Sequence, residues 1–220
     1  MIFTKEYLVF FKELAANNNR EWFLTNKKRY ESAVKIPFEK FIAELLHWLG
    51  TIDETLAISP KQAILRINRD IRFAADKSPY NLTMRAILSA QGSKDKEYPG
   101  IYISMGPEGI EFYAGWYGID KESLQHLRQR IVAQPQEFIK IIRQPDFLTR
   151  LGALQGDKNK VLPKDLKEAA LINPIIAHKQ FYVHKKMPAK LITSATLMPE
   201  IKGLCRCSMP LIAYLRKSAE

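Results

Sequence analysis

The sequence predicts an α+β fold, in which a helical N-terminal third packs on a mainly antiparallel sheet and further helices follow in the C-terminal half. Apolar residues recur at helical spacing through the first fifty residues. Runs rich in β-branched and aromatic residues, separated by Gly/Pro turns, then occupy the middle of the chain. Because no flexible linker or internal repeat interrupts the chain, we expect residues 1–220 to form a single domain.

Three helices are expected in the first fifty residues. The first carries an apolar stripe and ends at the polar triplet 17–19. Asn18 and Glu21 have the spacing of a capping box for the second helix. The third has Pro37 in its first turn and Gly50 as its C-terminal stop. Its predicted buried face comprises Phe38, Phe41, Ile42, Leu45, Leu46 and Leu49.

We interpret Ala63–Phe73 as a strand. Its apolar residues also fit a helix, but the β-branched content and the following Ser78–Pro79 turn favour a strand. Alternate side chains of a strand share a face, at intervals of roughly 6.5 Å. The apolar face would comprise Leu65, Ile67, Ile71 and Phe73, and the polar face Arg66, Asn68, Asp70 and Arg72.

The remaining elements are expected as follows. The clearest hairpin is residues 101–117, where two β-rich runs flank a Gly-Pro-Glu-Gly turn. Asp120 is expected to cap the helix that follows. Phe181–Lys186 has the pattern of a short strand. Ile201–Leu215 is predicted to be helical, with an interruption at Pro210.

The charge balance favours an anionic partner. Lys and Arg number 34 against 23 Asp and Glu, which gives a net charge of +11. Such an excess suits a small molecule with a phosphate or carboxylate group, and nucleic acid is the less favoured alternative. No apolar run approaches the roughly 18 residues that span a bilayer, so no membrane partner is expected. Two cysteines and the absence of a secretory pattern predict a cytoplasmic protein of undetermined oligomeric state.

Several stretches together resemble one known family. They are Phe11–Phe23, Arg66–Phe73, Asp76–Tyr80, Pro99–Ile103 and His178–Tyr182. They resemble the family called domain of unknown function 2461, and the resemblance covers nearly the whole chain. It implies a single α+β domain with no established reaction. Asn81 stands where the family usually has Lys, and residues 113–118 contain fewer glycines than usual, so a ligand that approaches either place closely would be bound differently here.

The main candidate site lies between Arg66 and Tyr80. Two guanidinium groups that flank a carboxylate can clamp a phosphate or carboxylate, while a lysine adds a point charge and a tyrosine adds a stacking ring. The ligand-binding candidates are Arg66, Asn68, Asp70, Arg72, Asp76, Lys77 and Tyr80. The alternative is that Asp70 and Asp76 pair internally with the arginines and hold the fold.

Secondary candidates lie elsewhere in the chain. Asn18 and Trp22 can supply amide hydrogen bonds and an aromatic platform at a pocket rim, or simply a helix cap and a core ring. His178 and Tyr182 suit acid–base chemistry, with packing as the alternative. The spacing of histidines and cysteines predicts no metal site. Because the sequence contains neither a phosphate-binding glycine loop nor a dinucleotide fingerprint, no cofactor is expected.

Three functions remain open from the sequence. The first is a binding module for an anionic ligand, held by the Arg/Asp/Lys cluster. The second is a metal-independent enzyme that uses Asp70, Asp76 and Lys77. The third is a structural or interaction protein in which the cluster only holds the fold. The sequence ranks the binding module first.

Overall fold

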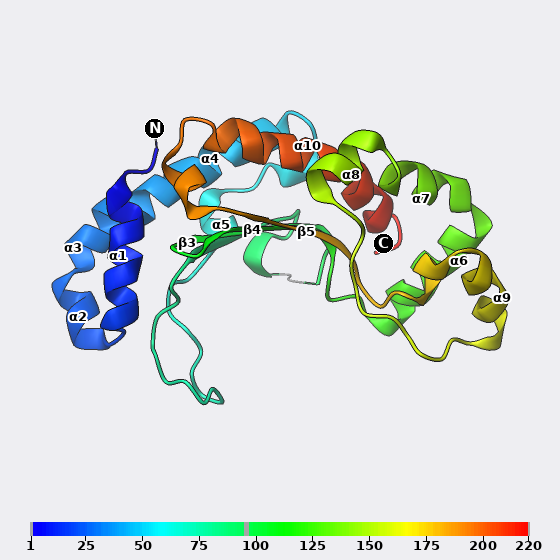
Figure 1. The fold of residues 1–220 in the computed structure, drawn as a ribbon, viewed down its shortest axis with the longest axis horizontal. Coiled ribbons are helices and arrows are strands. Elements are labelled where there is room, and N and C mark those ends of the chain that lie inside the picture. The colour runs from blue at the N-terminus through cyan, green and yellow to red at the C-terminus, as the bar shows by residue number, and fades with distance from the viewer. Residues whose placement is uncertain (1, 95–96, 220) are drawn as a thin grey trace. The chain divides into compact units, whose positions relative to one another are not determined.

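The computed structural model describes residues 2–94 and 97–219, apart from the side chain of Asp165. The α+β class is confirmed, because an N-terminal helical region is followed by a five-stranded antiparallel sheet and by further helices (Figure 1). The strands lie in the order β1-β2-β3-β4-β5.

The chain divides into two compact units, and β3, β4, β5 and α10 contribute residues to both. The N-terminal unit comprises residues 1–94, 102–112 and 186–202. The C-terminal unit comprises residues 95–101, 113–185 and 203–220. The single-domain organisation stays a prediction.

The first fifty residues of the N-terminal unit form helices, as their apolar periodicity predicts. The elements are α1 (Lys5–Ala16), α2 (Arg20–Thr25), α3 (Lys27–Tyr30), a π-helical turn (Glu31–Lys35) and α4 (Ile36–Gly50). Pro37 lies in the first turn of α4 and Gly50 ends it, as predicted. All six residues of the predicted buried face are at most 3% exposed. Arg29 of α3 forms ion pairs with Glu6 and Glu13 of α1 and so joins the two helices.

The segment after α4 corrects the sequence interpretation. A 3-10 turn (Glu54–Leu56), α5 (Pro60–Ala63) and β1 (Ile64–Leu65) are followed much later by β2 (Met84–Leu88). The predicted strand Ala63–Phe73 is therefore wrong outside β1, and β2 was not predicted. In β1 and β2, Ile64 lies opposite Ala86 and Leu65 opposite Arg85 in antiparallel register.

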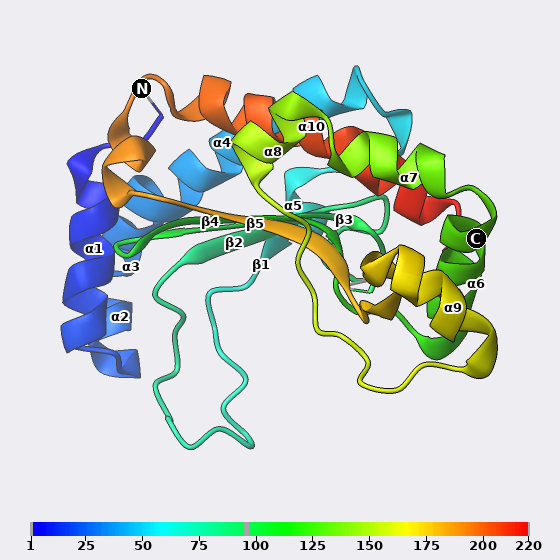
Figure 2. The ribbon, with the colours of Figure 1, turned by 45° about the vertical axis from the view of Figure 1, so that its right-hand side comes forward.

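Residues 66–83 form a long excursion between these two strands, which we call the β1–β2 loop. Figures 1 and 2 show it extending away from the sheet on the side opposite α4. Within the N-terminal unit, α4 packs against β2, whose alternate residues Met84, Ala86 and Leu88 are buried. The loop therefore leaves the sheet from the face that α4 does not cover.

The predicted hairpin and later strand are confirmed. A short 3-10 turn (Gly92–Lys94) precedes β3 (Gly100–Gly106), which pairs with β4 (Gly109–Trp116), and β5 (Phe181–Met187) adds the last strand. Gly109 has a φ of +128°, and a Cβ there would lie 2.3 Å from the Met187 carbonyl oxygen. Only glycine fits this close approach of two backbones.

The C-terminal unit is mainly helical. Its helices are α6 (Lys121–Ala133), α7 (Pro135–Ile142), α8 (Pro145–Leu151), α9 (Lys164–Ile172) and the second part of α10 (Leu197–Arg216). The Asp120 side chain accepts the Glu122 and Ser123 N–H groups, which confirms the predicted cap of α6. The Phe138 ring lies 6.0 Å from the Phe181 ring and 5.0 Å from the Tyr214 ring, between centroids.

The last helix differs from expectation at one position. Pro210 lies inside α10 and does not interrupt it. Its neighbours Met209, Leu211 and Ile212 are at most 9% exposed, so their burial outweighs the hydrogen bond that proline removes. Short 3-10 turns at Pro174–Ala177 and Ala189–Thr193 precede β5 and α10, respectively. No helix in the described part of the chain is long and apolar enough to cross a membrane.

Candidate functional site

The β1–β2 loop leaves the strand conformation because its own side chains satisfy its backbone. Asp70 Oδ1 accepts the Arg72 N–H at 3.3 Å, and Asp76 Oδ1 accepts the Ser78 N–H at 2.9 Å. Each is an Asx turn, which competes with a strand ladder. Pro79 also has no N–H to donate. The expected strand face is therefore wrong for the set Arg66, Asn68, Asp70 and Arg72.

Backbone hydrogen bonds close the neck of the loop. The Arg69 N–H donates to the Pro79 carbonyl at 2.8 Å, and the Asn81 N–H donates to the Ile67 carbonyl at 2.8 Å. The Asn81 amide Nδ2 donates to the same carbonyl at 2.7 Å. Asn68, which is exposed, pairs with Tyr80 in an isolated antiparallel bridge. The neck thus behaves as a short hairpin, and Asn81 is one of its closing residues.

Asn18 attaches the loop to the N-terminal helices. Its Nδ2 donates to the Tyr80 carbonyl at 2.9 Å, and its Oδ1 accepts the Tyr80 N–H at 3.1 Å. The Tyr80 ring stacks on Phe23 with centroids 4.0 Å apart and planes 17° apart. Tyr80 is 6% exposed, so its ring faces the core, whereas the sequence hypothesis required a surface ring.

Helix α2 is capped by Asn19, whereas the sequence predicts Asn18 as its cap. The Asn19 side chain, not that of Asn18, accepts the Trp22 N–H at 2.9 Å. The predicted Asn18–Glu21 capping box is therefore wrong by one position, because the Asn18 amide is already bonded to the loop. Trp22 is half-buried and its ring lies 5.5 Å from that of Phe10, as expected of a packing residue.

Both carboxylates of the loop have partners within it. Asp70 and Arg72 form a two-point pair, with Nε–Oδ1 at 2.9 Å and Nη2–Oδ2 at 2.6 Å. This hydrogen bonding lowers the pKa of Asp70. Asp76 accepts the Ser78 hydroxyl and pairs with Arg69. These bonds, that from Ser78 foremost, hold the pKa of Asp76 well below its usual range.

The remaining cations of the loop, Arg66 and Lys77, form no ion pair with a carboxylate in the described residues, although the charge of Arg66 helps to lower the pKa of Asp70. The Lys77 ammonium donates to the Ile71 carbonyl at 3.0 Å, a neutral partner. Arg66 is exposed, and it forms no ion pair with any residue that the structure describes. Residues 66–80 hold four Arg or Lys and two Asp, so the segment carries a net charge of +2.

Phe73 is a feature that the sequence interpretation placed wrongly. Alternation along the sequence places Phe73 on the apolar strand face, yet its side chain is 97% exposed. The run Arg72-Phe73-Ala74-Ala75 gives no sign of this, because alternation alone predicts burial. The signal available in the sequence is the density of turn-forming residues on either side.

His178 and Tyr182 in the C-terminal unit pack against different partners. His178 is 5% exposed and lies 5.8 Å from the Phe181 ring, and its Nδ1 has no hydrogen-bond partner among the described residues. Burial lowers the pKa of His178, the charge of Lys158 adds to this effect, and a backbone hydrogen bond with Gln180 opposes it.

Tyr182 belongs to an aromatic group formed by residues of β4 and β5 and by Tyr117, which directly follows β4. Its ring lies 5.9 Å from Tyr113 and 5.6 Å from Tyr117, and Tyr113 stacks on His184 at 4.2 Å. Burial raises the pKa of Tyr182, and the nearby Tyr117 and Asp157 raise it further. The ring is therefore a neutral phenol at physiological pH, which suits packing and hydrogen bonding better than proton abstraction.

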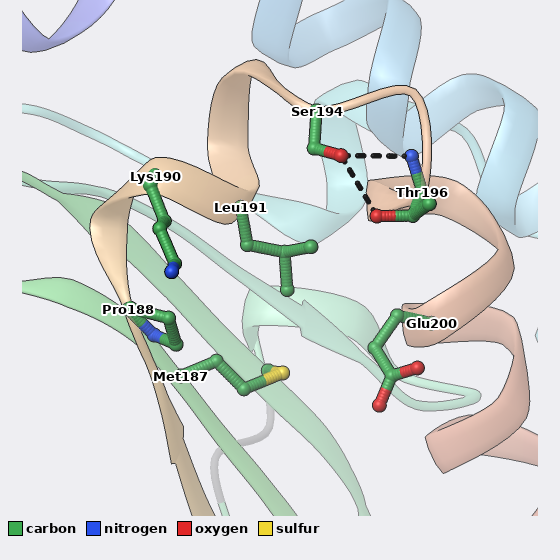
Figure 3. A pocket seen from close by; sticks show the side chains of 7 residues that line it. All are labelled: Met187, Pro188, Lys190, Leu191, Ser194, Thr196 and Glu200. Carbon is green, nitrogen blue, oxygen red and sulfur yellow. Dashed lines mark hydrogen bonds between the residues drawn. The ribbon is translucent and has the colours of Figure 1, made fainter.

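A pocket of about 430 Å³ was not predicted from the sequence. Figure 3 shows the residues that line it: Met187, Pro188, Lys190, Leu191, Ser194, Thr196 and Glu200. Ser194 Oγ accepts the Thr196 N–H at 3.1 Å and lies 2.8 Å from the Thr196 hydroxyl, so both side chains serve the turn before α10. The lining is largely apolar, and its two charged side chains, Lys190 and Glu200, have opposite signs, so the pocket shows no clear preference for an anion. Across the described residues, no group of three or more His, Cys, Asp or Glu is placed to hold a metal ion.

Comparison with known proteins gives one match. No curated protein and no solved structure matches the chain. A family model described as "Conserved hypothetical protein (DUF2461)" matches residues 6–214, a span that includes the β1–β2 loop and its Asn18 anchor. This match confirms the resemblance found in the sequence motifs. The chain therefore belongs to the conserved hypothetical family DUF2461.

Proposed function

We propose that the protein is a binding module for an anionic ligand, with phosphate or carboxylate groups, and that the β1–β2 loop is its contact surface. The observation that carries the proposal is the loop itself. It projects from the sheet and carries a net charge of +2, and the side chains of Arg66, Arg72 and Lys77 are exposed. A projecting basic surface attracts anions and can reach a large or small partner without steric hindrance.

The internal ion pairs of the loop are weak competitors for such a ligand. The side chains of Arg72 and Asp70 are 76% and 45% exposed. Water screens an exposed pair of this kind, so it contributes little to stability. A phosphate can therefore share or replace Asp70 at Arg72 at little cost. Arg66 and Lys77 need no such exchange, because neither is paired with a carboxylate in the described residues.

The same contacts argue against the two alternatives. Asp70 and Asp76 have lowered pKa values, so both are ionised and weakly basic at neutral pH, which makes them poor general acids or bases. The loop is attached through Asn18 and Tyr80, not through its charges. Asp70 and Asp76 shape the turns of the loop itself, but Arg66 and Lys77 form no ion pair in the described residues, so a fold-holding role does not account for these two charges.

The test is the salt dependence of binding to two polyanions, inorganic polyphosphate and polyglutamate, which present the two anion classes. We expect affinity to fall steeply with salt for at least one of them. Arg66→Ala should reduce the slope of log K against log salt by about 1. Lys121→Ala is the matched control, because it removes an exposed cation outside the loop.

Two results would overturn the proposal. One is the absence of salt-dependent binding to either polyanion. The other is an equal loss of slope in Arg66→Ala and Lys121→Ala, which would mean that only net charge matters. The free energy of unfolding separates the fold-holding alternative. Because Arg66 is exposed, we expect Arg66→Ala to change that energy by no more than about 0.5 kcal/mol.

A further inference from the structure

We infer that Phe73 is a base-stacking residue and that the ligand of the β1–β2 loop is single-stranded nucleic acid. This inference rests on the proposed function and specifies its ligand. The loop cations would contact phosphates while the Phe73 ring stacks on an unpaired base. Aromatic rings beside a basic backbone-tracking surface are the usual means of binding single strands without strong sequence preference.

The first support is the exposure of the ring. Phe73 is 97% exposed, the highest value among the large apolar side chains of the described residues that are exposed. Phe10, Phe11, Phe38 and Phe41 of the same unit are fully buried. A ring held out in water forgoes the burial that stabilises other phenylalanines, and this arrangement is readily explained if a partner covers the ring.

The second support is that the backbone around Phe73 is held in place. The Ala74 N–H donates to the Ile71 carbonyl at 3.4 Å, which closes a turn with Phe73 at its third position. The Lys77 ammonium reaches the Ile71 carbonyl at 3.0 Å and the Arg72 carbonyl at 3.5 Å. The ring is thus presented by a preformed turn, which reduces the ordering cost of binding.

The third support is the order of charges around the ring. Arg72 directly precedes Phe73 and Lys77 follows four residues later, so cations lie on both sides of the aromatic residue. Nucleic acid alternates phosphates and planar bases and matches this order. Further cations, Arg66 and Arg69, adjoin the residues that close the neck, so the basic run continues along the loop.

Two related partners fit less well. In a duplex each base is stacked on its neighbours, so the contact with a single ring would have to offset the free-energy cost of separating two stacked bases. An anionic membrane needs more than one inserting group for stable attachment, and the only other large exposed apolar side chain in the described loop is Leu82, which is 36% exposed. Single-stranded nucleic acid is therefore the ligand that the loop matches best.

The experiment measures anisotropy of labelled oligothymidylate, oligouridylate and an abasic oligonucleotide of the same length, with wild-type protein and three variants. Phe73→Ala should weaken binding to the base-bearing strands by about 5- to 150-fold, which is the usual range for loss of one base–aromatic stack. It should leave binding to the abasic strand unchanged. Comparison of the first two strands shows whether DNA or RNA is preferred.

The other two variants separate stacking from simple hydrophobic contact. Phe73→Trp should bind like the wild type, and oligothymidylate should quench its additional tryptophan fluorescence. Phe73→Leu keeps an apolar side chain without a ring and should bind as weakly as Phe73→Ala. Because residue 73 is almost fully exposed, all three variants should keep the wild-type unfolding midpoint.

Failure of the inference is distinguishable from failure of the proposed function. If salt-dependent binding to the abasic strand and polyphosphate is present but Phe73→Ala does not weaken binding to base-bearing strands, the stacking role is overturned and anion binding stands. If Phe73→Leu matches the wild type and phosphatidylserine vesicles bind in a Phe73-dependent way, the ligand is a lipid surface and the inference is overturned. If the wild type binds no polyanion at all, both proposals are overturned.

Discussion

Replacement of Asn18 by alanine should loosen the β1–β2 loop from the N-terminal helices. The Asn18 amide bonds both backbone groups of Tyr80, a residue 62 positions away in the sequence. Asn18→Ala leaves the Tyr80 N–H and carbonyl without these partners in a part-buried place. Without the two Asn18 hydrogen bonds, the stacking of Tyr80 on Phe23 remains as a contact between the loop and the N-terminal helices.

The expected loss follows from the two hydrogen bonds. Each contributes about 1 kcal/mol net, so Asn18→Ala should lower the free energy of unfolding by about 2 kcal/mol. For a chain of this size that corresponds to a decrease in Tm of about 4–8 °C. Asn18→Asp should be at least as harmful, because it keeps the acceptor for the Tyr80 N–H but places a carboxylate oxygen against the Tyr80 carbonyl.

The asparagine triplet provides its own controls. Asn17 donates only to the exposed Glu13 carbonyl, at 3.0 Å, so Asn17→Ala should cost less than about 0.5 kcal/mol. Asn19 caps α2, so Asn19→Ala should cost about 1 kcal/mol. Urea unfolding measures these losses, and limited trypsin digestion reports on the loop, whose arginines and lysine are cleavage sites. The reasoning is refuted if Asn18→Ala resembles Asn17→Ala in stability and the loop is cleaved no faster.

Two further predictions concern buried titratable groups. Because burial holds the pKa of His178 below its usual value, the unfolded chain binds more protons at this ring, and the free energy of unfolding should fall as the pH drops below about 6.5. Urea unfolding between about pH 5 and 7.5 should show a smaller fall for His178→Gln, and an unchanged fall would contradict this. Burial raises the pKa of the Cys205 thiol far above its usual value, whereas Cys207 is only half-buried and its pKa is raised less. A disulfide reagent such as dithiobis-nitrobenzoate should therefore label Cys207 first and Cys205 only after unfolding, and equal rates in the folded protein would argue against this.

The parts of the fold that the sequence predicts are those governed by neighbours along the chain. The buried face of α4, its Pro37 start and its Gly50 end follow from helical spacing and capping rules. The Asp120 cap and the hairpin of residues 101–117 are equally local. Each depends on residues within a few positions of one another, which is why a single sequence is enough.

The candidate site is only partly of this kind. The sequence indicates that residues 66–80 are basic and that Asp70 and Asp76 have arginines near them. The sequence does not show which arginine pairs with each carboxylate. In the structure Asp76 pairs with Arg69, whereas the strand interpretation places these two residues far apart. The pocket beside α10 is likewise not predicted from the sequence, because it forms where the end of β5, the turn that follows and the start of α10 come together.

Chain order and local spacing thus determined by themselves the α+β class, the end of α1, both ends of α4, the start of α6 and the basic character of the β1–β2 loop. The tertiary structure decided three things: that Asn18 is a loop anchor, that Tyr80 faces the core and that Phe73 faces water. The physical reason is that the first two residues have partners far away in sequence, across the gap between residues 18–23 and 80. This attachment fixes the neck of the β1–β2 loop, and the Asx turns then keep the rest of the loop out of the strand conformation. Hydrophobic periodicity in the sequence does not predict this arrangement.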